Sequence, residues 1–412
     1  MASTTRERRL RRNLPLLCGF RALQMTLFPV AVITLFMTAH LGLTLTDVFI
    51  LQALFSLFTA LLEFPGGYVA DRIGYRRSML LACGASMAGW CVYSFAASFE
   101  VIVVAELLLA TSLALTSGTD TALMYESLVE LDEESSFARW LGRSRSLGAV
   151  SEGSAALAAG VMFAFDPRLP LYAQTLVWIP NAVIVLLLVE PQRARAAPQR
   201  AWAHARELLH FAASRSPRLR ATIVTQVALG LSTFAPVWII AVYAERAGLA
   251  VVWIGPLWAV ANYAVALGNI TSDRWERSRG LHATLLGSVL LVALGYAGLG
   301  LTHAVFGFVF YYAICMGRGL ASPVLNHAQQ RLIPSSDRAA LLSINSLLFR
   351  ASFAILGPVF GIAFDTWGEH AVLGAMGTLF LAASLASLSW LRTQPQPDGP
   401  PRIERAPTTA GE

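Results

Sequence analysis

The chain has 412 residues, of which 56% are hydrophobic and 14% are charged, and its mean hydropathy is +0.57. Soluble domains have about 25% charged residues, so this chain has too few polar side chains to cover a soluble surface. The same figures exclude a disordered chain, and only four Cys exclude a small disulfide scaffold. The net charge of +6 comes from 31 Arg spread between apolar runs, with no Lys, which argues against nucleic-acid binding. The composition predicts a polytopic membrane protein.

Twelve segments of the sequence are apolar and long enough to cross a membrane, which takes about 20 residues. They cover residues 14–40, 47–68, 78–97, 101–128, 144–165, 171–190, 221–244, 251–271, 282–301, 304–330, 339–364 and 370–391. The first exceeds the roughly 7–15 apolar residues of a signal-peptide core, so we expect it to be retained as a span. The prediction is an all-α membrane protein with twelve transmembrane helices.

The distribution of Arg predicts the orientation. The loops of one side, together with both ends of the chain, hold 26 Arg, whereas the loops of the other side hold Arg168 and Arg246. Basic residues concentrate on the cytoplasmic side of membrane proteins, so we expect both termini in the cytoplasm and an even number of spans. The expected location is a bacterial cytoplasmic membrane.

A long polar connection divides the chain into two parts of similar length. The predicted organisation is a basic cytoplasmic segment, a first six-helix half, a cytoplasmic connection, a second six-helix half, and a Pro-rich tail that we expect to be disordered. These parts cover residues 1–13, 14–190, 191–220, 221–391 and 392–412.

The two halves contain weakly similar stretches. Residues 66–77 and 268–279 share one Gly, one Asp and two Arg at an offset of 202, and Ala-Phe-Asp recurs at 164–166 and 363–365 with an offset of 199. Two such pairs of similar stretches indicate an internal duplication. The predicted architecture is therefore two pseudo-symmetric six-helix bundles around a central cavity, with the substrate near the middle of the membrane.

The loop between the second and third segments, GYVADRIGYRR at residues 67–77, resembles the signature loop of the major facilitator superfamily. This resemblance implies a secondary transporter in which the loop latches the two halves in one conformational state. The residues carried over to that latch are Gly67, Asp71, Arg72, Gly74, Arg76 and Arg77. Tyr75 stands where the family usually has a basic residue, which makes the latch either weaker or dependent on Arg76.

Two further stretches resemble bacterial efflux-like members of this family. Residues 63–67, EFPGG, match an E-x-P-x-G pattern before the signature, and residues 117–128 resemble the end of the fourth helix. The chain departs from drug/proton antiporters at Glu106, where they often carry Arg, and it lacks their Gly-Pro motif in the fifth span. The resemblance implies export more weakly than it implies the fold.

Charged residues inside the first half predict a proton site. Arg21, Glu63, Asp120 and Glu152 all lie roughly 8–12 Å deep from the same side at a rise of 1.5 Å per residue. Carboxylates near one Arg suit reversible protonation, and we expect Asp120 first and Glu63 second to carry the proton. A static ion-pair network is the alternative. Glu106 shares a helix face with Asp120 but lies nearer the outer end, where it could instead reach water.

The second half has two Arg inside its spans and no acid at mid-span. A buried guanidinium needs an anion, so Arg318 and Arg350 predict a substrate with an acidic group. Backbone carbonyls or first-half acids are the alternative partners. The other candidate substrate-binding residues are Tyr311 and Ser322 on the face of Arg318, and Gln226 and Asn262, which could equally join helices to each other.

No P-loop, HExxH or GxSxG motif is present, so we expect a transporter and no enzyme. All four Cys lie in apolar runs, and we expect no metal site and no cofactor. The expected function is export of a small amphipathic, acid-bearing or metal-chelating compound, such as a siderophore-like metabolite or drug, by proton antiport. Proton-coupled uptake of an organic acid and a non-transporting receptor or scaffold are the alternatives. The expected partners are substrate, protons and the lipid bilayer, with the protein acting as a monomer.

Overall fold

A computed structural model describes residues 5–192, 217–302, 304–333 and 338–395. Over these residues the regular structure is helical throughout. Ten of the described helices are long and apolar enough to cross a membrane. Most of the predicted central connection and most of the tail lie outside the described residues.

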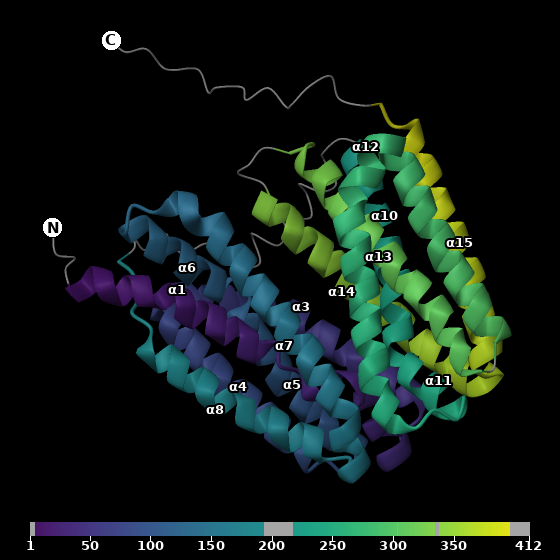
Figure 1. Ribbon diagram of the computed structural model, residues 1–412, viewed down its shortest axis with the longest axis horizontal. Coiled ribbons are helices and arrows are strands. Elements are labelled where there is room, and N and C mark those ends of the chain that lie inside the picture. Colours follow the sequence, from purple (N-terminus) through teal and green to yellow (C-terminus); the bar gives the residue numbers. More distant parts are fainter. Residues whose placement is uncertain (1–4, 193–216, 303, 334–337, 396–412) are drawn as a thin grey trace.

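The described helices form two lobes, one from each half of the chain (Figure 1). The first lobe contains α1 (Thr5–Gln24), α2 (Ile33–Leu35), α3 (Leu45–Ile73), α4 (Tyr75–Ser94), α5 (Phe99–Thr116), α6 (Thr119–Glu130), α7 (Phe137–Phe165) and α8 (Leu169–Leu187). The second contains α10 (Pro217–Phe234), α11 (Ile240–Arg246), α12 (Ile254–Leu301), α13 (Phe308–Gln330), α14 (Arg338–Trp367) and α15 (Glu369–Thr393).

The predicted eighth and ninth segments are merged in α12, which turns at Gly280. Gly280 has φ +82° and ψ 166°, a conformation that is open to Gly and strained for other residues. With α12 divided at this turn, and with the 20-residue α4 included, the helices follow the order of the twelve predicted segments. The fourth predicted segment is also interrupted, because Gly118 has φ +76° between α5 and α6.

The first and seventh predicted spans are broken in the same way. A 3-10 turn at Phe28–Ala31 (η1) follows α1, and a 3-10 turn at Ala235–Trp238 (η4) follows α10. Each turn contains a Pro near its start, Pro29 and Pro236, which removes a backbone N–H and ends the α-helical pattern. This shared break is further support for the internal duplication.

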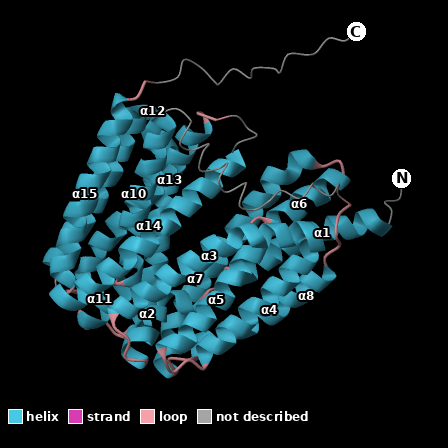
Figure 2. Cartoon of the chain, turned by 180° about the vertical axis from the view of Figure 1, so that it is seen from behind, coloured by secondary structure: helices cyan, strands magenta, loops and turns pink. Residues whose placement is uncertain are grey.

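The lobes converge at the end of the molecule away from the chain termini, and we call this end the far side. Figures 1 and 2 show the lobes diverging toward the termini, while α2 and α11 lie together on the far side. There Phe49 of α3 stacks on Phe364 of α14, with ring centroids 6.1 Å apart. The backbones also approach closely, since a Cβ on Gly255 would lie 2.1 Å from the carbonyl oxygen of Ala156. Apolar packing therefore joins the halves on the far side.

Candidate functional site

A cavity lies in each half, and equivalent helices line the two. The first-half cavity, of about 260 Å³, lies between α1, the α5–α6 junction and α7. The second-half cavity, of about 430 Å³, lies between α10, α13 and α14. These helices hold the first, fourth and fifth places in the six predicted spans of each half. The duplication therefore extends to the cavities.

The second-half cavity combines a cation with polar side chains and an apolar wall. Arg318, Ser322 and Asn326 follow one another at four-residue intervals on α13 and so share one helix face. Gln226 comes from α10, and Phe349 comes from α14. Among the described residues that line this cavity, Arg318 is the one charged residue.

An acid of the other half interacts electrostatically with Arg318. Glu152 on α7 lies in electrostatic range of Arg318 and, with a smaller effect, of Arg21 on α1. Within the described part of the chain, no ion pair within 4.0 Å is resolved for Glu152 or Arg318. Glu152 therefore interacts electrostatically with cations of both halves, and among the described residues it forms an ion pair with neither.

Arg350 has a similar relationship with Glu63. Its Nε donates to Ser346 Oγ at 3.2 Å within α14, and Glu63 on α3 is the acid in electrostatic range. The Ser117 hydroxyl lies 3.5 Å from Glu63 Oε1. Of the partners that the sequence left open for the two second-half Arg, the structure thus favours acids of the first half.

Arg21 and Asp120 line the first-half cavity together, but each has another hydrogen-bond partner. Arg21 donates to Gln24 Oε1 at 2.8 Å. Asp120 accepts from the backbone N–H of Thr121 at 2.7 Å and from its hydroxyl at 3.2 Å. Because Asp120 lies in the first turn of α6, the helix dipole also stabilises its negative charge.

Glu106 lies apart from these cavities. Its side chain is buried, and Gln52 Nε2 donates to its carboxylate at 3.2 Å. The expectation that Glu106 could reach water near the outer end is wrong, because α3 and α4 cover it against α5. A hydrogen-bonded position inside the first bundle explains how the chain tolerates this acid.

The remaining candidate substrate residues divide into two groups. Gln226 and Ser322 line the second-half cavity. Tyr311 is instead buried in the far-side core, and Asn262 donates to the carbonyl of Trp258 on its own helix at 3.3 Å. Neither Tyr311 nor Asn262 is among the residues that line the second-half cavity.

The signature loop makes its turn at one glycine. Gly74 has φ +99° and joins α3 to α4. Gly67 lies inside α3 with open space around it, whereas a Cβ on Gly66 would lie 2.6 Å from the carbonyl oxygen of Ala114. The close helix approach therefore depends on Gly66, which precedes the predicted latch. Arg72 bonds to Tyr68 of its own helix at 3.0 Å.

Glu190, which follows α8 and was not among the predicted site residues, contacts this loop. Its carboxylate accepts hydrogen bonds from the backbone N–H groups of Tyr75 at 2.7 Å and Arg76 at 2.8 Å, so it caps the start of α4. The Arg76 side chain in turn donates to the carbonyls of Val185 and Leu186 at the end of α8. The loop is thus bound to the segment that follows the sixth span.

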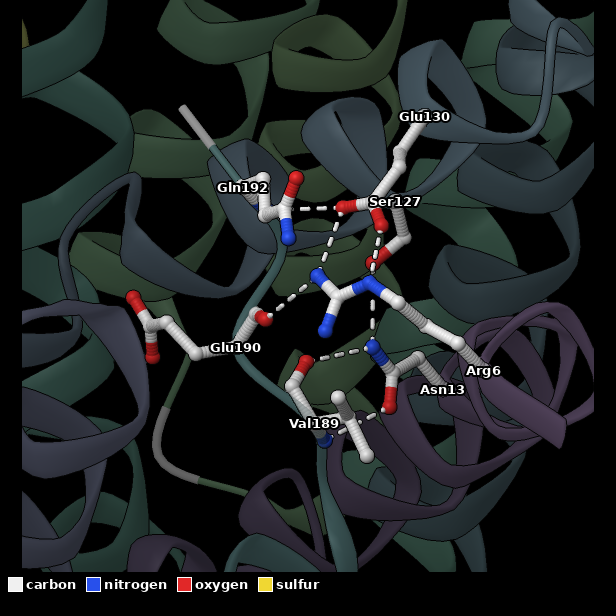
Figure 3. Close-up of polar contacts among 7 residues, drawn as sticks. All are labelled: Arg6, Asn13, Ser127, Glu130, Val189, Glu190 and Gln192. Carbon is white, nitrogen blue, oxygen red and sulfur yellow. Dashed lines mark hydrogen bonds and ion pairs between the residues drawn. The ribbon is translucent and has the colours of Figure 1, made fainter. Parts of the chain in front are cut away.

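The same segment is held by α1 and α6 (Figure 3). Arg6 pairs with Glu130 and donates to the Glu190 carbonyl at 3.4 Å, and Glu130 also accepts from the Gln192 backbone at 2.7 Å. Asn13 exchanges two hydrogen bonds with the backbone of Val189. Because Arg6 makes these contacts from within α1, part of the predicted N-terminal basic segment is helical.

Two helical lobes with long apolar helices, charged side chains on those helices and a cavity in each lobe are the features of a membrane transporter. The family model of the Major Facilitator Superfamily matches residues 16–350, so the chain belongs to this superfamily. It is a transporter and not an enzyme. Among curated proteins, no relative matches.

Solved structures of transporters share the fold. The nucleoside transporter NupG superposes with a TM-score of 0.77 at 12% identity, covering 93% of this chain and 100% of that one. The peptide transporter POT in complex with sulfate gives a TM-score of 0.75 at 14% identity, covering 92% and 94%. A bacterial homologue of the human lysosomal transporter Spinster, inward-facing and unoccupied, gives 0.67 at 16% identity, covering 95% and 96%. At these identities the likeness concerns the fold alone.

Proposed function

We propose that this chain is a proton-coupled secondary transporter of a small amphipathic organic anion. It lies in a bacterial cytoplasmic membrane with both termini in the cytoplasm, acts as a monomer, and exposes its cavities to one side at a time. The observation that carries the proposal is the position of Arg318, which is the one charged residue among the described lining of the second-half cavity and interacts electrostatically with Glu152 of the first half.

The guanidinium of Arg318 is always charged, so the contents of the cavity must compensate this charge. Ionised Glu152 provides a negative charge from the other half. A proton on Glu152 removes that charge and leaves Arg318 to bind an anionic substrate, with two parallel hydrogen bonds to a carboxylate or similar group. Proton and anion therefore favour each other's binding, and this linkage supports cotransport of both in the same direction.

Asp120 and Glu63 are the other candidate proton sites. Asp120 shares the first-half cavity with Arg21, and Glu63 acts on Arg350. We rank Glu152 above both because its carboxylate has no hydrogen-bond partner among the described residues, whereas Asp120 is bonded to Thr121. Glu106, bonded to Gln52, takes no part in the proposed coupling.

Export by proton antiport is the second candidate, and a sequence observation favours it. Residues 63–67 and 117–128 resemble efflux-like members of the superfamily. A metal-chelating or drug-like acid fits the same cavity, and antiport requires that substrate and proton exclude each other.

The test uses purified protein in liposomes that contain a pH-sensitive dye, with 6-hydroxynaphthalene-2-sulfonate added outside. This anion is permanently charged and does not cross the bilayer by itself. Cotransport acidifies the lumen, and antiport makes it alkaline. No change in lumenal pH relative to liposomes with Arg318→Ala would contradict proton-coupled anion transport.

A further inference from the structure

Two pairs of amide side chains lie at the wall of the second-half cavity. Gln226 Nε2 of α10 donates to Asn326 Oδ1 of α13 at 3.2 Å. Asn345 Nδ2 of α14 donates to Gln329 Oε1 of α13 at 2.7 Å. Three of these four residues, Gln226, Asn326 and Asn345, line the cavity. The amides thus connect the three helices that surround it.

These pairs leave polar atoms without partners. Among the described residues, Gln226 Oε1, Asn345 Oδ1 and Gln329 Nε2 are buried and make no hydrogen bond. Two amides joined by a single N–H to oxygen bond always leave one oxygen and one NH₂ group facing elsewhere, whichever way the amides are turned. Buried polar atoms are nearly always bonded in folded proteins, so this concentration beside one cavity requires an explanation.

We propose that Gln226 and Asn345 recognise a hydrogen-bond donor on the uncharged part of the substrate, while Arg318 binds its anionic group. This inference rests on the proposed function and specifies its substrate class: an organic anion that also carries an O–H or N–H group. In the empty cavity each amide bonds to its neighbour on α13. Rotation of both side chains toward the cavity brings Gln226 Oε1 and Asn345 Oδ1 to the substrate donor.

The rest of the wall fits an aromatic or otherwise apolar body between these two polar ends. Phe234 of α10 and Phe349 of α14 both line the cavity and meet edge to face, with centroids 5.3 Å apart. Leu229 and Leu325 extend the apolar surface. The volume of about 430 Å³ lies in the usual range for small-molecule sites.

The experiment measures binding to purified protein in lipid nanodiscs, where transport direction does not enter and one fixed pH keeps the proton concentration equal for both probes. The probes are 6-hydroxynaphthalene-2-sulfonate and its methyl ether, 6-methoxynaphthalene-2-sulfonate, which differ in one donor and share charge and ring. We expect wild type to bind the hydroxyl probe about 10-fold more tightly, the upper range for one hydrogen bond. Asn345→Ala and Gln226→Leu should each reduce this preference to about 2-fold or less.

Arg318→Ala has a different expected effect. It should weaken both probes by a similar factor of about 10 or more and keep the preference for the hydroxyl probe, because the donor is recognised elsewhere. Asn269→Leu is the matched control, since this amide lies exposed on α12 and outside the cavity lining. It should change neither affinity nor preference.

The outcomes separate the two proposals. Failure of Arg318→Ala to weaken either probe, or absence of binding of both, overturns the proposed function. Two other outcomes overturn only the present inference, provided that Arg318→Ala loses affinity. In one, wild type shows no preference for the hydroxyl probe. In the other, the preference survives both amide substitutions. If Asn345→Ala gives no monodisperse protein, Gln226→Leu on the opposite helix decides the question.

Discussion

Asp365 near the end of α14 accepts two hydrogen bonds from Thr46 at the start of α3, from the backbone nitrogen at 2.7 Å and from the hydroxyl at 2.6 Å. Leu45 adds a third backbone bond at 3.2 Å. A carboxylate in this position satisfies free N–H groups of a helix start and interacts favourably with the helix dipole. Because Asp365 and Thr46 belong to different halves, this cap joins the lobes on the far side.

The duplicated counterpart of Asp365 has a different role. Asp166, from the matching Ala-Phe-Asp at the end of α7, accepts a hydrogen bond from the backbone of Arg168 at 2.7 Å within its own loop. The repeated Ala-Phe-Asp therefore identifies two equivalent helix ends. Asp365 at one of them bonds to the other half, whereas Asp166 bonds within its own loop. We infer that alternating access must break the Asp365 contacts when the far side opens.

The first prediction concerns this contact. Asp365→Asn weakens the cap by about 1 kcal/mol, because a neutral amide accepts hydrogen bonds less strongly than a carboxylate. We expect a roughly fivefold shift toward states with an open far side, measured as distances between spin labels on the far-side ends of α3 and α14. Asp166→Asn is the control and should leave the distance distribution unchanged. An unchanged distribution in Asp365→Asn would show that apolar packing alone closes the far side.

The second prediction compares neighbouring glycines of α3. Gly66→Ala places a methyl group 2.6 Å from the Ala114 carbonyl oxygen, so α3 and α5 must separate. We expect a loss of about 1–3 kcal/mol in stability, visible as a lower melting temperature of the purified protein. Gly67→Ala meets nothing within 4 Å and should be nearly neutral. Equal effects of both substitutions would contradict the close approach.

The third prediction concerns Glu190. Glu190→Ala removes the cap from the start of α4 and should cost about 1 kcal/mol, with a lower melting temperature and a less ordered signature loop. Glu133→Ala is the control, because its pair with Arg11 is exposed and such pairs contribute little. Hydrogen exchange at the start of α4 is the direct measurement. Protection that is equal in wild type and Glu190→Ala would exclude the capping role.

The fourth prediction concerns the geometry of anion binding. Arg318→Lys keeps the charge but loses the planar pair of donors, so we expect only partial recovery of sulfonate or carboxylate affinity relative to Arg318→Ala. A neutral probe, 2-naphthol, should bind all three proteins within about 2-fold. Full recovery by Lys would show that charge alone, without bidentate geometry, binds the anion.

Much of the fold follows from the sequence because membrane spans are long, apolar and punctuated by charge. The repeat at residues 66–77 and 268–279 predicts two related halves, and the family match and the fold confirm this architecture. Helix boundaries were less predictable. Gly118 places a turn inside an apolar run that hydropathy reads as continuous. Gly280 is the turn between two apolar runs that hydropathy reads as separate and that the structure joins in α12.

The candidate site was predictable only in part. Counting residues along a helix gives the depth of Glu152 and Arg318 but not the direction in which each faces, so their relationship across the halves required the structure. Glu190 was missed because it caps a helix 115 residues away. The signal that could have found it is an acid at the last position of the predicted sixth span, in a chain whose loops on that side are rich in Arg.

In the proposed mechanism, a proton and an organic anion bind together through Glu152 and Arg318. The most direct measurement is the lumenal pH of proteoliposomes after addition of 6-hydroxynaphthalene-2-sulfonate, for wild type and Glu152→Gln, with Asp120→Asn and Glu63→Gln for comparison. The account predicts acidification by wild type and anion entry without acidification by Glu152→Gln. Wild-type acidification that persists in Glu152→Gln and disappears in Asp120→Asn would move the proton site to the first-half cavity, and alkalinisation by wild type would contradict the mechanism itself.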